Sequence, residues 1–268
     1  MVGSGTFSTQ GDSGSMRAAV VVAHPVHLFR LYGWIEENKP VIYSLTNSEG
    51  TGPLGPSHTT DLMRQLERLG ATVGEVFDTS DADIYRAVLG GDAALFIGMM
   101  TRIAASLVRH DVGLVVADAH EGCSVAHDLC RAVTDGAVAL AAAELTHDIA
   151  NYGCHQTEWW DPPPPHDGSC RHLVLDDATF RRKLAAAAQY PEWNGVIQEA
   201  IDHLGTDHFR TECLRAVPDS RLPIYPSKPF YETSGERQVA QGRFATVIRY
   251  AEHVRPIWSA LHARAGLG

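Results

Sequence analysis

Short apolar runs alternate with stretches of helical periodicity through the first half of the chain. The runs predict strands over residues 18–23, 41–45, 71–77 and 112–117. Apolar residues at helical spacing predict helices over residues 28–37, 62–69, 94–109 and 125–145. This alternation predicts an α/β fold with a doubly wound, mainly parallel, Rossmann-like sheet. The carboxyl ends of its strands should meet at one edge, where such folds bind ligands.

The pattern changes after about residue 150. A Trp-, Pro- and His-rich stretch without periodicity comes first, and helices are then predicted near residues 177–189 and 194–204. A late strand is expected within 208–217, and the end of the chain reads as helices broken near Gly242 and Pro256. We predict a disordered tail over 1–16 and one domain over 17–268. Its core is 17–150, and a C-terminal elaboration, 151–268, packs on that core.

Composition excludes several classes of function. The chain has 268 residues and a formal net charge of −10 without a basic stripe, which argues against nucleic-acid binding. It has no apolar run of about 18 residues, so no membrane span is expected. Five cysteines without a CxxC pair argue against a disulfide framework and favour a reducing, cytoplasmic compartment. A small-molecule substrate remains as the expected partner, and the chain could form a homo-oligomer.

Three histidines form the main candidate site. His24 and His27 directly follow the first strand, and His127 lies at the start of the helix that follows the fourth. If these two strands are neighbours in the sheet, the three imidazoles should meet. Three imidazoles with an open fourth position suit a divalent metal, zinc first, although iron and copper also accept such ligands. The alternative is that these are ordinary loop histidines in a chain that has 14 of them.

Several segments resemble the PIG-L/LmbE superfamily of metal-dependent N-deacetylases. They are VVVAHPVH, VIYSLTNSEGTG, LERLGA and EGCSVAHD, and they occur in the family's order within residues 17–150. The resemblance implies an LmbE-type fold, a bound divalent metal, and hydrolysis of an amide in an amino sugar or a related small metabolite.

The first motif departs from the family pattern. Where the family's AHPDDE segment has a His ligand, an Asp base and an Asp ligand, this chain has His24, Val26 and His27. The resemblance therefore implies His24, His27 and His127 as metal ligands, but valine cannot move a proton. In the second motif the position before His127 is Ala126, and the family's earlier histidine is Ser124.

These departures leave the reaction open. Zinc held by neutral imidazoles lowers the pKa of water to about 7, which can replace a carboxylate base. Amide hydrolysis still needs a proton for the leaving amine, and the candidate catalytic residues are His120, Glu121 and Asp128, with Glu49 as a further candidate. Each of the three acids also has an ordinary interpretation as a helix-start or solvated loop charge.

Two other functions fit the same residues. A three-histidine site could hold iron or copper and serve an oxidoreductase, which would not need the missing base. Alternatively, the chain could be a non-catalytic descendant that only binds a metal or another ligand. Metal content distinguishes the first alternative from hydrolysis.

Overall fold

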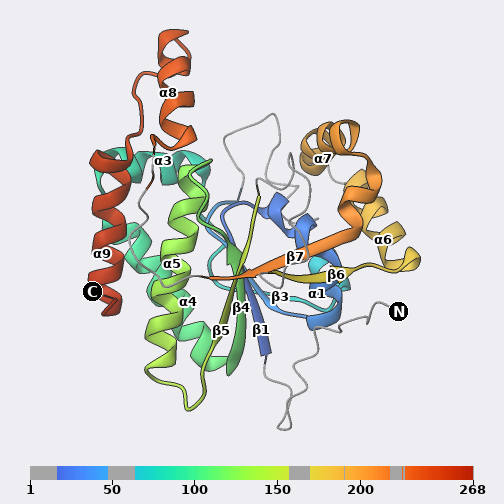
Figure 1. Ribbon diagram of the computed structural model, residues 1–268. Coiled ribbons are helices and arrows are strands. Elements are labelled where there is room, and N and C mark those ends of the chain that lie inside the picture. Colours follow the sequence, from blue (N-terminus) through green and yellow to red (C-terminus); the bar gives the residue numbers. More distant parts are fainter. Residues whose placement is uncertain are drawn as a thin grey trace.

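A twisted sheet with helices on both faces organises the computed structural model (Figure 1). The structure describes residues 17–47, 64–156, 170–189, 191–217, 225 and 227–267, with no side-chain description for 191–196. The predicted N-terminal tail, Glu49 and the Trp- and Pro-rich stretch from 157 to 169 lie outside the described residues.

Among the described residues, seven strands form the sheet in the order β3-β2-β1-β4-β5-β7-β6. The strands are β1 Arg17–Val22, β2 Val41–Ser44, β3 Thr72–Val73, β4 Val112–Asp118, β5 Ala150–Cys154, β6 Cys170–Val174 and β7 Thr211–Ala216. The first five are parallel, and β7 runs antiparallel to both β5 and β6. Strand β1 pairs with both β2 and β4, so the adjacency on which the histidine cluster depends is present.

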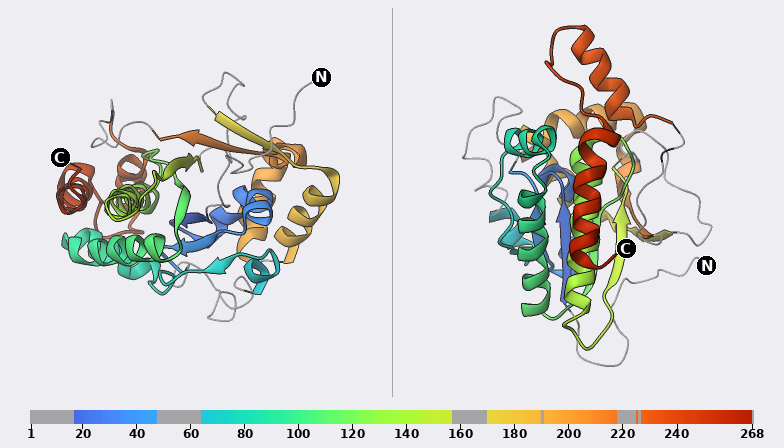
Figure 2. Two further views of the ribbon diagram at one scale, coloured as in Figure 1. Left: turned by 90° about the horizontal axis from the view of Figure 1, so that it is seen from below. Right: turned by 90° about the vertical axis from the view of Figure 1, so that its left-hand side faces the viewer.

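The helices form two layers (Figure 2). They are α1 Tyr32–Asn38, α3 Asp81–Gly90, α4 Ala93–Arg109, α5 Val125–Ala142, α6 Asp177–Gln189, α7 Pro191–Leu204, α8 Phe230–Ala240 and α9 Arg255–Ala265. Helices α4 and α5 pack on one face of the sheet, α9 packs on the outer side of these two helices, and α1, α6 and α7 lie on the other face. Neighbouring residues of β1 serve both cores: Val21 packs in the first and Val20 in the second, as the two-residue repeat of a strand requires.

The doubly wound α/β prediction is confirmed, but some element bounds differ. The helix predicted over 28–37 begins earlier, as a 3-10 helix over Pro25–Leu31, because Pro25 favours a first helical turn. The strand predicted over 71–77 is reduced to Thr72–Val73. A Cβ at Gly74 would lie 2.2 Å from the ring of Tyr43, so only glycine fits where the strand ends.

Other differences concern elements that were not predicted and the two expected helix breaks. Strands β5 and β6 were not predicted, and neither was α3, although Ser80 caps it by accepting the backbone N–H of Asp83. The break near Gly242 is present, with a positive φ of 70°. Pro256, expected as a break, instead lies in the first turn of α9, where its missing N–H costs no hydrogen bond. Among the described residues, no helix is long and apolar enough to cross a bilayer.

Candidate metal centre

The turn after β1 fixes the relative position of His24 and His27. The backbone of His24 is extended, with φ −130° and ψ 144°, and Pro25 then starts the 3-10 helix. The backbone N–H of His27 donates to the carbonyl of His24 at 3.1 Å. Residues three apart in a 3-10 turn project to the same side, so the spacing itself brings the two imidazoles together.

His127 joins them from the first turn of α5. The ring centroid of His127 is 4.5 Å from that of His27 and 5.7 Å from that of His24, and the His24 and His27 centroids are 5.3 Å apart. The structure therefore brings together the three residues that the sequence grouped as metal ligands. They meet at the carboxyl ends of the central strands β1 and β4, because those strands are neighbours.

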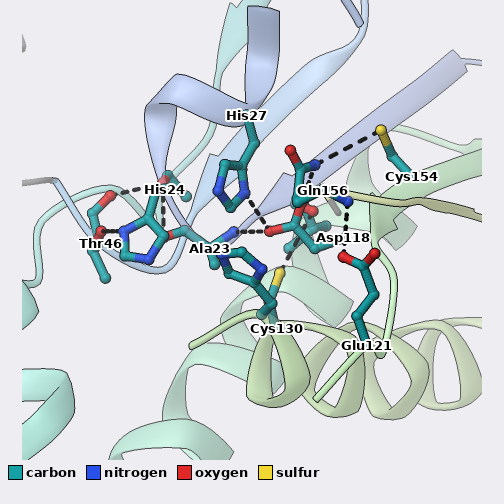
Figure 3. Close-up of polar contacts among 12 residues, drawn as sticks. Ala23, His24, His27, Thr46, Asp118, Glu121, Cys130, Cys154 and Gln156 are labelled. Atoms are coloured by element: carbon teal, nitrogen blue, oxygen red, sulfur yellow. Dashed lines mark hydrogen bonds and ion pairs between the residues drawn. The ribbon is translucent and has the colours of Figure 1, made fainter. Parts of the chain in front are cut away.

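Each of the three rings has its Nδ1 atom against a protein group. His27 Nδ1 lies 2.7 Å from a carboxylate oxygen of Asp118, and His24 Nδ1 lies 3.0 Å from the hydroxyl of Thr46 (Figure 3). His127 Nδ1 lies 3.3 Å from the sulfur of Cys123. These contacts leave Nε2 of each ring to act as a ligand. Metal-binding histidines typically show this arrangement, in which the other ring nitrogen donates to an outer partner.

Asp118 is a functional residue that sequence reasoning missed. It is the last residue of β4 and is completely buried. Besides His27, its carboxylate accepts the N–H of Ala23 at 2.7 Å and the side-chain amide of Gln156 at 2.9 Å. Burial favours the neutral acid, but His27 and these hydrogen bonds outweigh burial and hold the pKa of Asp118 below its usual value. The sequence feature that could have identified Asp118 is its place as an acid at the end of the apolar run VGLVVAD.

A second carboxylate faces His24. Asp81, in the first turn of α3, places an oxygen 3.3 Å from His24 Nδ1, and its side chain is 2% exposed. Two of the three imidazoles therefore have an aspartate on the Nδ1 side, which favours the tautomer with Nε2 available.

His127 is held in the neutral form that binds metals. The pKa of His127 is lowered to about 3, mainly by burial and next by the neighbouring His27. A neutral imidazole presents a lone pair to a cation without first losing a proton. With Nδ1 of each ring against a protein group, His24, His27 and the neutral His127 offer imidazole ligands of the kind that zinc, iron and copper accept.

Glu121 adds a carboxylate beside His127. Ligand atoms of Glu121, Cys123 and His127 all lie within 4.8 Å of one another. The Glu121 carboxylate also accepts the backbone N–H of Gln156 at 2.8 Å and lies 3.3 Å from His155 Nδ1. Burial, with nearby acids, raises the pKa of the Cys123 thiol to about 12, so Cys123 is a neutral thiol in this setting.

The other two catalytic candidates, His120 and Asp128, belong to a separate network. Asp128 is fully buried and accepts the backbone N–H groups of Glu121 and Gly122 at 3.1 and 3.0 Å. The hydroxyl of Tyr225 contacts both Asp128 and His120. The structure therefore brings Glu121 to His127, whereas His120 and Asp128 meet at the hydroxyl of Tyr225.

Tyr225 was not identified from the sequence. It follows a segment without periodicity, and its closeness to His120 depends on the tertiary fold. Val26, which stands where the resemblance implies a base, is partly exposed and packs against the second core. Its surroundings are those of an apolar residue.

The fold is an α/β fold that matches solved structures of deacetylases. A teicoplanin-pathway deacetylase has a TM-score of 0.52 and 11% identity, covering 76% of this chain and 100% of its own. The zinc-inhibited form of teicoplanin deacetylase Orf2 has a TM-score of 0.50 and 12% identity, with the same coverage. The conserved protein TT1542 from Thermus thermophilus has a TM-score of 0.51 and 16% identity, covering 80% and 99%. No protein-family model and no curated protein sequence matches the chain.

Proposed function

We propose that this protein is a metal-dependent hydrolase that removes an acyl group from the amide nitrogen of a small metabolite, with amino sugars as the substrate class. The observation that carries the proposal is the cluster of His24, His27 and His127, whose ring centroids are 4.5–5.7 Å apart. The likeness of the fold to deacetylases supports hydrolysis over the alternative chemistries.

His24, His27 and His127 would hold the ion through Nε2, and Asp118 would orient His27. A divalent ion supplies Lewis-acid polarisation of a carbonyl and lowers the pKa of water. Zinc is the expected metal because imidazole ligands suit it.

Glu121 is the proposed proton carrier. In amide hydrolysis, water adds to the carbonyl carbon, the C–N bond breaks, and the departing amine must gain a proton. Of the three candidates, only Glu121 groups with a histidine of the cluster, since its carboxylate lies within 4.8 Å of a ligand atom of His127. His120 and Asp128 act as positioning residues, because Asp128 holds the backbone of Glu121.

The proposal is tested by metal analysis together with amine release. Protein purified without added metal should contain zinc, and it should release free amine from N-acetylated amino sugars. His27→Ala should lose about one equivalent of zinc and lose activity, because one imidazole ligand is gone. His147→Ala is the matched control, since His147 lies on the surface beside Asp111, and it should keep both properties.

Other outcomes would redirect or overturn the proposal. Stoichiometric iron or copper in place of zinc, without amine release, would favour the oxidoreductase alternative. Wild-type protein without bound metal, and with metal content unchanged by His27→Ala, would overturn both enzymatic interpretations. Circular dichroism of each variant shows whether a loss comes from unfolding.

A further inference from the structure

A second group of metal-binding side chains lies at the far end of the sheet. Cys170 and His172 are on β6, and Cys213 is on β7. The sulfur, nitrogen and sulfur ligand atoms of these three residues all lie within 4.8 Å of one another. In the order β4-β5-β7-β6, β7 and β6 are two and three strands beyond β4, which corresponds to a lateral distance of about 10–15 Å from β4.

Strand pairing explains why these side chains meet. His172 and Cys213 are directly opposed in the antiparallel ladder, so their side chains share one face of the sheet. Cys170 precedes His172 by two residues and therefore projects from the same face. The register is set by five consecutive pairs, from Cys170 opposite Arg215 to Val174 opposite Thr211, so the grouping does not depend on a loop.

The environment suits a soft divalent cation. Cys213 is 4% exposed, and Cys170 and His172 are half-buried. Two thiolates and a neutral imidazole neutralise a +2 ion, which limits the cost of placing charge in a partly buried site. Thiolate ligands favour zinc over hard cations such as magnesium or calcium.

The spacing is close to what zinc needs. With Zn–S of about 2.3 Å and Zn–N of about 2.0–2.1 Å, ligand atoms of one tetrahedral ion lie about 3.5–3.8 Å apart. The three ligand atoms lie within 4.8 Å of one another, so a contraction of at most about 1 Å would bring them to this spacing. We propose that Cys170, His172 and Cys213 form a second zinc site that joins edge strand β6 to β7.

This site would have a mechanical role distinct from the proposed hydrolysis. Within the part of the chain that the structure describes, strand β6 is at the end of the sheet and pairs with β7 alone. The segment between the two strands contains α6 and α7. An ion bound by both strands would close the loop formed by this long connection. It would also keep β6 paired with β7, which matters because edge strands are the part of a sheet most open to pairing with other chains.

Cobalt(II) binding tests the proposal, because thiolate ligands give cobalt an intense near-ultraviolet charge-transfer absorption that imidazoles do not. Metal-free His27→Ala protein, in which the histidine cluster is incomplete, should show this absorption when cobalt(II) is added, and zinc should displace it. Cys213→Ser and Cys170→Ser, each made in the same background, should lose most of the absorption. Cys123→Ser should keep it, which excludes the cysteine beside His127 as its source.

Three results would overturn the proposal: no thiolate absorption with cobalt(II), absorption that persists in both Cys170→Ser and Cys213→Ser, or a Cys170–Cys213 disulfide. Thiol titration of unreduced, denatured protein detects the disulfide, since it should report five thiols, and two fewer would mean that the pair is oxidised. If a serine variant does not fold, the cobalt(II) absorption of the His27→Ala parent and the thiol count still show whether thiolates bind the ion.

Discussion

The carboxylate of Asp118 contacts Nδ1 of His27 and thereby fixes the orientation of the His27 ring. Asp118→Asn removes its charge and weakens the hydrogen bond at 2.7 Å to His27 Nδ1, while the side-chain volume stays nearly the same. We expect metal affinity to fall by about 10–100-fold, the usual effect of losing such a partner. Competition with a chromophoric chelator measures this directly.

Asp128→Asn is the control for this substitution. Asp128 is as buried as Asp118, but its described contacts are with the backbone of Glu121 and Gly122, and with Tyr225 and His120. It should lose stability and keep its affinity for the metal. Equal affinities for wild type and Asp118→Asn would show that the carboxylate does not orient His27.

At the scale of single residues, the sequence predicts the three clustered histidines but not the side chains that form hydrogen bonds with them. His24 and His27 could be grouped because three-residue spacing acts within one turn, and His127 because strand ends converge on one edge. Asp118 belongs to a buried strand, where an acid at the last position is easily taken as the end of the run. The link from Gln156 to Asp118 depends on a turn after β5, and the sequence did not predict that strand.

At the scale of elements, a buried ion pair attaches α1 to α6 and β7. Glu212 on β7 accepts the backbone N–H groups of Gly33 and Trp34 at 2.9 and 2.8 Å and pairs with Lys183 of α6 at 2.9 Å. Both side chains are 1% exposed. Burial lowers the pKa of Lys183, and Glu212 partly offsets that effect.

Lys183→Met should therefore lower the free energy of unfolding substantially. It leaves the Glu212 charge buried without its cation, and we expect a loss of about 3–5 kcal/mol in the free energy of unfolding, measured by urea titration. Arg182→Met is the matched control on the same helix. Its partner Glu36 and the arginine itself are 30% and 49% exposed, so less than about 1 kcal/mol should be lost. Similar losses in the two variants would contradict a special role for the buried pair.

The two halves of the sheet differ in how far the sequence predicts them. Strands β1, β2 and β4 are buried on both faces and read as continuous apolar runs. Strands β5 and β6 are partly exposed and mix cysteine, histidine, arginine and asparagine with apolar residues, so neither periodicity nor composition marks them. Their pairing with β7 is non-local and depends on packing.

At the scale of the whole molecule, the half-buried His120 and the buried His262 make the fold sensitive to acid. The ring of His120 lies 5.2 Å from that of Trp258 on α9, and His262 Nε2 accepts the indole N–H of Trp258 at 2.7 Å. Burial lowers the pKa of both histidines, an effect that nearby acids such as Asp128 and Asp135 only partly offset. Both are therefore neutral in the folded chain at pH values where an unfolded chain starts to protonate them.

Stability should fall as the pH drops below about 6.5, the ordinary pKa of histidine. In that range the unfolded chain binds more protons than the folded one, so each histidine removes at most about 1.4 kcal/mol per pH unit until its folded pKa is reached. Urea titrations between pH 7 and 5 should show a shallower dependence for His120→Gln than for wild type. His147→Gln should not show this, because Asp111 raises the pKa of His147. An unchanged slope in His120→Gln would contradict the assignment.

The order of the strands along the chain also sets an order of events during synthesis. The central cluster is complete before residue 155, since it consists of His24, His27, Asp118 and His127. The parallel strands also end before that residue, whereas β6 and β7 begin at Cys170 and Thr211. A chain that leaves the ribosome amino end first contains every residue of the central cluster before the antiparallel pair of β6 and β7 has been synthesised. Until β7 arrives, β5 is an open edge available to other nascent chains. The interval between residues 154 and 211 is therefore when this protein is most exposed to aggregation.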